Sequence, residues 1–122
     1  MGVNNSRVFI VQQPVRVRRD PITKEVKTLE PVFDVTPAAQ YGTLELLLDS
    51  GLSFGIAMKP VVQMLNEKLR DFTDDDYILP TGDPCVMGIA IAIAAKHNGG
   101  RVAVLRWDKR ERQYIACRDI EI

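Results

Sequence analysis

The sequence predicts an α+β fold in which two helices pack on one face of a mainly antiparallel sheet of about five strands. Val-rich segments typical of strands lie at both ends of the chain, and two helical segments lie between them. A chain of 122 residues with 46% hydrophobic content can bury one sizeable core. We therefore expect a single compact domain over residues 1–122, with the element order β-β-β-α-α-β-β.

The N-terminal part is expected to form a long, irregular hairpin. Its two strands cover residues 7–18 and 25–35, and turn residues connect them at 19–24. Pro14 and Pro31 interrupt these strands, because proline cannot donate a ladder hydrogen bond. We therefore place both strands at an edge of the sheet or at a bulge.

The middle of the chain begins with a short helical turn at Thr36 and Pro37, a capping residue followed by proline. Residues 43–48 (TLELLL) are expected to be a buried strand, although their leucines are also compatible with a helix. A loop at 49–55 leads to an amphipathic helix over 59–72, whose apolar positions recur at spacings of three and four.

An almost unbroken apolar run predicts a second helix, buried in the core. Asp83 can cap its start, Pro84 fits the first helical position, and the Asn-Gly-Gly at 98–100 suits its exit. The helix would be roughly 21 Å long at ~1.5 Å per residue, which is too short to cross a bilayer. The residues that precede it, 78–80, are expected to be only a short apolar link.

The C-terminal segment is expected to form a second hairpin. Residues 101–107 and 113–122 are rich in β-forming side chains, and a charged stretch of polar residues (DKRER) separates them.

Composition limits the classes of protein that are possible. The formal net charge is zero, but basic residues predominate in 1–27 and 84–122 and acidic residues in 28–83, a segregation that can steer a partner. The sequence has neither a secretion signal nor a long apolar run, so we expect a cytoplasmic protein that does not span a membrane. Cys85 and Cys117 are expected to be buried, reduced thiols, and no metal or other cofactor is expected.

No group of residues suggests catalysis. His97 has no neighbour that marks it as a base, and the serines lack a nucleophile motif. The acidic run Asp74, Asp75 and Asp76 lacks the ligand spacing of a calcium loop. We interpret it as a solvated turn, as the cap of a short helix that begins near Thr73, or as a docking loop for a basic partner. We therefore expect a protein that is not an enzyme.

The strongest indication of function is the mixture of cations and aromatic rings in the C-terminal hairpin. Such a mixture can contact nucleic acid, although arginine and lysine on exposed strands also prevent aggregation. The candidate binding residues are Arg101, Arg106, Trp107, Lys109, Arg110, Arg112 and Tyr114, and Arg16, Arg18 and Arg19 extend this surface if the first hairpin lies nearby.

Three segments resemble small, uncharacterised proteins encoded by bacteriophages and prophages. They are DDDYILPTGDP at 74–84, NGGRVAVLRWDKRERQY at 98–114 and VFDVTPAAQYG at 32–42. The resemblance implies a compact protein made in an infected bacterial cell, where such proteins bind phage or host macromolecules. The leading hypothesis is therefore a non-enzymatic accessory protein or inhibitor with a protein partner. The alternative is a nucleic-acid-binding accessory protein that uses the C-terminal hairpin, and either hairpin has edge strands that permit a homo-oligomer.

Overall fold

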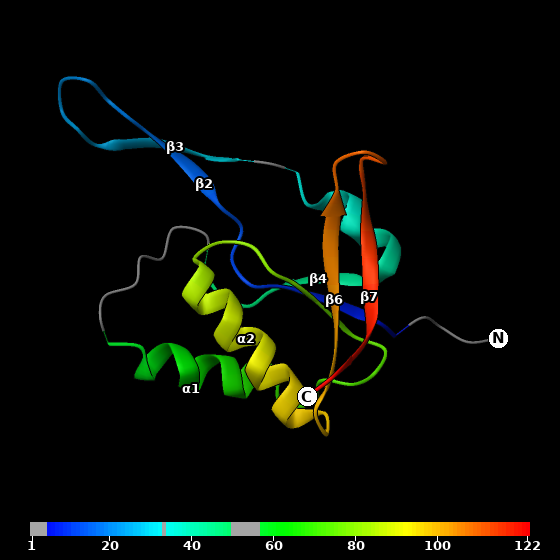
Figure 1. Cartoon of the computed structure of the whole chain (residues 1–122). Helices are drawn as coiled ribbons and strands as arrows, with labels where there is room; N and C mark the ends of the chain where they lie inside the picture. The colour runs from blue at the N-terminus through cyan, green and yellow to red at the C-terminus, as the bar shows by residue number, and fades with distance from the viewer. Residues whose placement is uncertain (1–4, 33, 50–56) are drawn as a thin grey trace.

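The computed structural model describes residues 5–32, 34–49 and 57–122, and it has ten helices and strands (Figure 1). In chain order these elements are β1 (Arg7–Ile10), β2 (Val15–Arg19), β3 (Val26–Pro31), η1 (Thr36–Tyr41), β4 (Thr43–Leu46), α1 (Lys59–Lys68), β5 (Tyr77–Leu79), α2 (Pro84–His97), β6 (Arg101–Asp108) and β7 (Gln113–Glu121). The α+β class is confirmed, and so is a strand within 43–48. This strand was expected to be buried, but β4 lies at the edge of the sheet and its residues are mostly exposed, whereas Leu47 and Leu48 just after it are buried. Most of the loop expected at 49–55 lies outside the described residues.

The central sheet is mixed, with the strand order β4-β1-β5-β6-β7. Its first four strands are parallel, and only β7 runs antiparallel to its neighbour β6. The prediction of a mainly antiparallel sheet was therefore wrong. It failed because residues 77–79 form a strand, β5, rather than a link. Since β5 lies between α1 and α2, the predicted order β-β-β-α-α-β-β was wrong as well. All three residues of β5 are buried, and a short apolar run without alternation is typical of a central parallel strand.

The expected N-terminal hairpin is present, because β2 and β3 pair antiparallel across a turn, but it is shorter than predicted. The chain from 7 to 18 divides near Pro14: β1 enters the middle of the sheet, whereas β2 pairs only with β3. The pair β2–β3 forms a separate two-stranded sheet, which extends away from the body of the protein (Figure 1). We call this pair, with its connecting turn, the ribbon (residues 15–31).

The two helices pack on the same face of the central sheet, as predicted. Leu65 of α1 and Ala90 of α2 are both completely buried, in a core that also contains Phe9 of β1. The predicted start of α2 is confirmed, because the Asp83 carboxylate accepts hydrogen bonds from the amides of Cys85 and Val86 at 2.8 and 3.4 Å.

Helix α2 is less buried than its hydropathy predicted. Cys85, Gly88 and Ala92 are exposed, so one side of the helix faces solvent. These side chains are small, and their exposure therefore leaves little apolar area in water. Both cysteines are free, but only Cys117 is partly buried.

The opposite face of the sheet is covered by η1 and the segment that precedes it. Ala38 and Val35 pack there against Leu79 and Leu105. The Tyr41 hydroxyl donates a hydrogen bond to the backbone carbonyl of Tyr114 at 2.6 Å, which ties η1 to β7. Among the described residues, no helix is long and apolar enough to cross a membrane.

Candidate functional site

The end of the β6–β7 hairpin brings an exposed and a buried aromatic ring together. Trp107 and Tyr114 face each other across the two strands, with ring centroids 4.9 Å apart in an edge-to-face arrangement. Trp107 is 44% exposed, whereas Tyr114 is only 4% exposed. Burial raises the pKa of the Tyr114 phenol, and the Asp34 carboxylate adds to this effect. The tyrosine thus supports an indole ring that remains accessible to a partner.

One edge of β6 has no neighbouring strand near these rings. Strand β5 ends at Leu79 and pairs with β6 only through Ile78 and Val104. Beyond Val104, β6 continues to Asp108 beside β7 alone, as far as the described residues show. Its other edge therefore presents backbone groups that an added strand can pair with.

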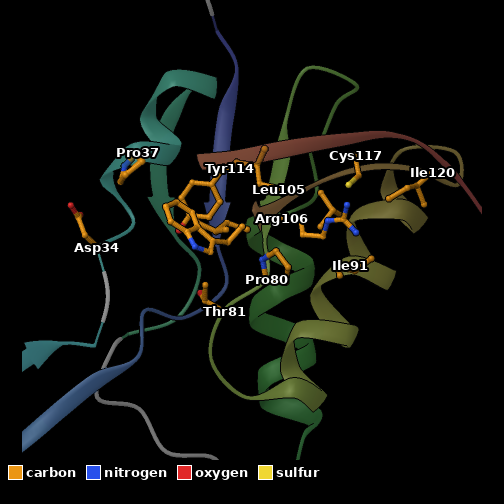
Figure 2. Close-up of a pocket in the computed structure, with 13 residues that line it drawn as sticks. Asp34, Pro37, Pro80, Thr81, Ile91, Leu105, Arg106, Tyr114, Cys117 and Ile120 are labelled. Atoms are coloured by element: carbon orange, nitrogen blue, oxygen red, sulfur yellow. The ribbon is translucent and has the colours of Figure 1, made fainter. Parts of the chain in front are cut away.

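A groove of about 900 Å³ lies beside this edge (Figure 2). Tyr114, Leu105 and Pro80 occupy its centre, with Pro37 at one end and Ile91 at the other. Its remaining lining residues are Asp34, Leu79, Thr81, Val104, Arg106, Trp107, Cys117 and Ile120. Most of these side chains are apolar. The volume of the groove suits a few residues of an extended chain or a small molecule.

The sequence that follows β5 keeps the groove open. Pro80 cannot continue the ladder, and the Thr81 hydroxyl donates a hydrogen bond to the backbone carbonyl of Gln12 at 2.7 Å. Gly82 then turns the chain with a φ of 96° into the cap of α2 at Asp83. The chain thus leaves the sheet instead of extending β5 along β6.

The rim of the groove formed by the β6–β7 turn has a small excess of basic side chains, with Lys109, Arg110 and Arg112 against Asp108 and Glu111. Arg106 contributes to the lining, and Lys109, Arg110 and Arg112 lie in the hairpin turn. All four side chains are exposed, and none forms an ion pair within the described part of the chain. The Asp108 carboxylate accepts hydrogen bonds from two amides of the turn, at 2.9 and 3.4 Å, which holds it in shape. This rim favours a negatively charged partner.

The other predicted binding residues lie elsewhere. Arg101 is at the opposite end of β6, where it pairs with Asp74 at 3.0 Å. Arg16, Arg18 and Arg19 are on the ribbon, which extends away from the β6–β7 turn (Figure 1). Of the ten predicted residues, three line the groove, namely Arg106, Trp107 and Tyr114. Three more, Lys109, Arg110 and Arg112, lie in the hairpin turn that follows β6.

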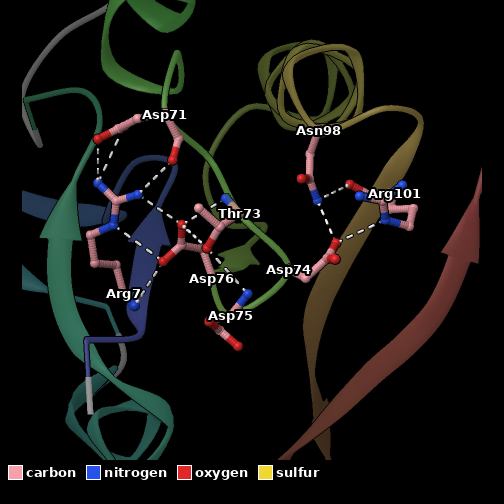
Figure 3. Close-up of polar contacts among 8 residues, drawn as sticks. All are labelled: Arg7, Asp71, Thr73, Asp74, Asp75, Asp76, Asn98 and Arg101. Carbon is pink, nitrogen blue, oxygen red and sulfur yellow. Dashed lines mark hydrogen bonds and ion pairs between the residues drawn. The ribbon is translucent and has the colours of Figure 1, made fainter. Parts of the chain in front are cut away.

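Two of the three predicted docking carboxylates make structural contacts (Figure 3). Asp76 is 1% exposed and binds the Arg7 guanidinium at 2.8 Å. Asp74 accepts hydrogen bonds from Arg101 and Asn98, and the Arg101 bond, the larger effect, lowers the pKa of its carboxyl. Only the Asp75 side chain is left for a partner. No group of three His, Cys, Asp or Glu side chains in the described residues could hold a metal ion.

Sequence reasoning missed the part of the groove that other elements provide. Pro37, Pro80 and Ile91 come from three separate segments, and only the order of the strands brings them to the β6–β7 hairpin. The available signal was the apolar run at 77–79. In sheets with parallel strands, ligands bind in the crevice beyond the carboxyl ends of the strands. Residues 77–79, read as a parallel strand, therefore predict a binding site just after Leu79.

Fold and groove together define a small α+β protein with a mixed sheet and an apolar groove beside an uncovered strand edge. A family model described as Phage Pam3 gp32-like protein matches residues 6–119. The chain therefore belongs to this phage protein family, which confirms the resemblance noted in its sequence. No curated protein and no solved structure matches it.

Proposed function

We propose that the chain is a non-enzymatic phage accessory protein, which binds an extended segment of a partner protein in the groove. The uncovered edge of β6 carries this proposal, because it lies directly beside the groove. A strand added to that edge gains main-chain hydrogen bonds, while its alternate side chains enter the apolar lining.

The chemistry of the rim indicates what the segment contains. Apolar side chains suit the groove between Trp107, Pro80 and Ile91, and carboxylates suit the unpaired cations of the β6–β7 turn. We therefore expect acidic and apolar residues in alternation, the period of a strand. Such a segment would belong to a phage or host protein in the infected cell.

Selection from a random peptide display library tests this proposal. The immobilised protein should enrich sequences in which acidic and apolar residues alternate. A variant with Trp107→Ala and Arg106→Glu should lose this enrichment, because it lacks the exposed ring and one cation of the groove. The matched control carries Arg16→Glu on the ribbon and should select the same peptides as the wild type. The absence of enrichment, or equal enrichment by the groove variant, would refute the proposal.

Single-stranded nucleic acid is the second candidate partner, favoured by the exposure of Trp107 among four unpaired cations. To distinguish a peptide partner from nucleic acid, the protein is titrated with oligo-dT at low and at physiological salt, and the fluorescence of its tryptophan is followed. Nucleic-acid binding should quench Trp107 at saturation, weaken steeply with salt, and disappear when Arg110 and Arg112 are both replaced by Glu. An unchanged signal at low salt would exclude this candidate.

A further inference from the structure

We propose that the groove selects the charge of a bound segment separately on the two faces of the sheet: Arg106 favours an acidic side chain on one face, and Asp34 rejects one on the other. This inference rests on the proposed function, because it specifies which segment the groove accepts. The preferred segment has one acidic residue, which lies beside Arg106, between two apolar residues.

The lining of the groove includes residues from both faces of the central sheet. Leu105 and Tyr114 belong to the buried cluster on the side of η1, whereas Val104 and Ile91 pack against the core on the side of the two helices. Successive side chains of a strand point to opposite faces, so Arg106 shares the helix side with Val104. The groove therefore extends around the open edge of β6, from one face to the other.

The two charged side chains in the lining lie on different faces. Asp34 and Arg106 are the charged members of the lining in the described residues, and both are exposed. Figure 2 shows Asp34 on the same side of Tyr114 as Pro37, and Arg106 on the other side, near Cys117. Arg106 forms no ion pair with a described residue, so its charge is available to a partner.

Asp34 keeps its negative charge beside the groove. Its Oδ1 atom accepts hydrogen bonds from the backbone amide and the hydroxyl of Thr36, at 2.9 and 2.7 Å. These bonds, the amide bond above all, lower the pKa of the Asp34 carboxyl. After burial, the same carboxylate is the second cause of the raised pKa of Tyr114, in the centre of the groove. The electrostatic field of Asp34 therefore reaches the place that a bound segment would occupy.

Strand pairing decides which side chain of the segment meets which charge. A strand that pairs with the open edge of β6 places each side chain on the same face as the β6 residue directly opposite it. The residue opposite Arg106 therefore lies on the helix side, while the residues opposite Leu105 and Trp107 lie on the side of η1. A carboxylate opposite Arg106 is attracted to the guanidinium, whereas a carboxylate opposite Trp107 lies among apolar side chains and is repelled by Asp34.

Peptides based on an enriched display sequence test the role of Arg106, with the fluorescence of Trp107 as the signal of binding. Two peptides carry Glu or Lys at the acidic position of that sequence and are otherwise identical. The wild type should bind the Glu peptide about three- to tenfold more tightly, as expected when an attractive cross-strand charge pair is replaced by a repulsive one. Arg106→Glu should reverse this preference. Lys109→Glu is the matched control: it makes the same change of charge in the turn, outside the lining, and should keep the preference for Glu.

A third peptide tests the role of Asp34. In it, the acidic residue and its apolar neighbour exchange places, so that the carboxylate lies on the side of η1. The wild type should bind this peptide more weakly than the original, and Asp34→Asn should bind it about threefold more tightly than the wild type does, because the repulsion is removed. Asn keeps the oxygen that accepts hydrogen bonds from Thr36, so this variant should leave the preference opposite Arg106 unchanged.

The outcomes distinguish this inference from the function on which it rests. A wild type that enriches no segment would refute both. Three results would refute the selection by charge and leave the proposed function standing: equal binding of the Glu and Lys peptides, a preference that Arg106→Glu does not reverse, or a preference that Lys109→Glu reverses equally. An Asp34→Asn variant that binds the exchanged peptide no better than the wild type would overturn the role of Asp34.

Discussion

Replacing Asp76 by alanine is expected to destabilise the protein by about 3 kcal/mol. The Asp76 carboxylate accepts five hydrogen bonds: from the backbone amide, Nε and Nη2 of Arg7, and from the backbone amide and hydroxyl of Thr73. Each backbone amide left unsatisfied costs about 1–3 kcal/mol, and loss of one partner from a buried ion pair costs about 3–5 kcal/mol. Arg7 keeps its bonds to Asp71 and is 23% exposed on its side chain, so we expect the lower end of this range.

Urea denaturation followed by circular dichroism measures this loss. With a slope of about 1–3 kcal/mol per molar urea, the unfolding midpoint should fall by about 1–3 M. The control is Asp75→Ala, one residue away, because the Asp75 side chain is exposed and makes no hydrogen bond within the described residues. Its effect should stay within about 0.5 kcal/mol. Equal effects of the two substitutions would refute the assignment of Asp76 as the structural carboxylate.

Three further predictions concern the glycines, the cap of α2 and the groove. Thermal unfolding should show that Gly88→Ala stabilises by up to about 1 kcal/mol, since the added carbon would have no atom within 4 Å other than those of the local helix backbone and its chain neighbours. Gly100→Ala should destabilise instead, because its φ is 90° and the added carbon would lie 2.5 Å from a backbone oxygen. Asp83→Ala should cost about 1 kcal/mol of unfolding free energy, as expected for loss of a helix cap. The raised pKa of Tyr114 predicts a stability contribution that is complete below the ordinary tyrosine pKa and is lost as pH rises through the folded-state pKa. The absorbance of tyrosinate as a function of pH, measured as the difference between the wild type and Tyr114→Phe, should show the raised pKa of Tyr114. Asp34→Asn should lower this pKa.

Helix α2 could be predicted from the sequence because its signals are local. Asp83, Pro84 and the glycines after the helix specify its ends whatever packs against it. The α1 helix was predicted four residues too long, because Leu69 and Phe72 continue the apolar spacing beyond its end at Lys68 and are buried without being helical.

The topology could not be predicted, because it depends on contacts between distant segments. The buried run in β1 has the same composition as an edge strand of a hairpin, and only its pairing with β4 and β5 distinguishes the two. Strand β5 has three residues, too few to show a period. The same reasoning applies to the groove: Trp107 and the cations of the turn are neighbours in sequence, whereas Pro37 and Ile91 reach them only through the fold.

The most direct test of the proposed function is to map the binding site of an enriched peptide by amide NMR. The protein is titrated with the most strongly enriched display peptide, and hydrogen exchange is compared with and without it. Main-chain pairing predicts slower amide hydrogen exchange and large chemical-shift changes at residues 105–108 of β6. Chemical-shift changes are also expected at Leu79 and Thr81, on either side of Pro80. The amides of the ribbon should be unaffected. Changes confined to the ribbon or to the outer edge of β7, with none at 105–108, would contradict the account.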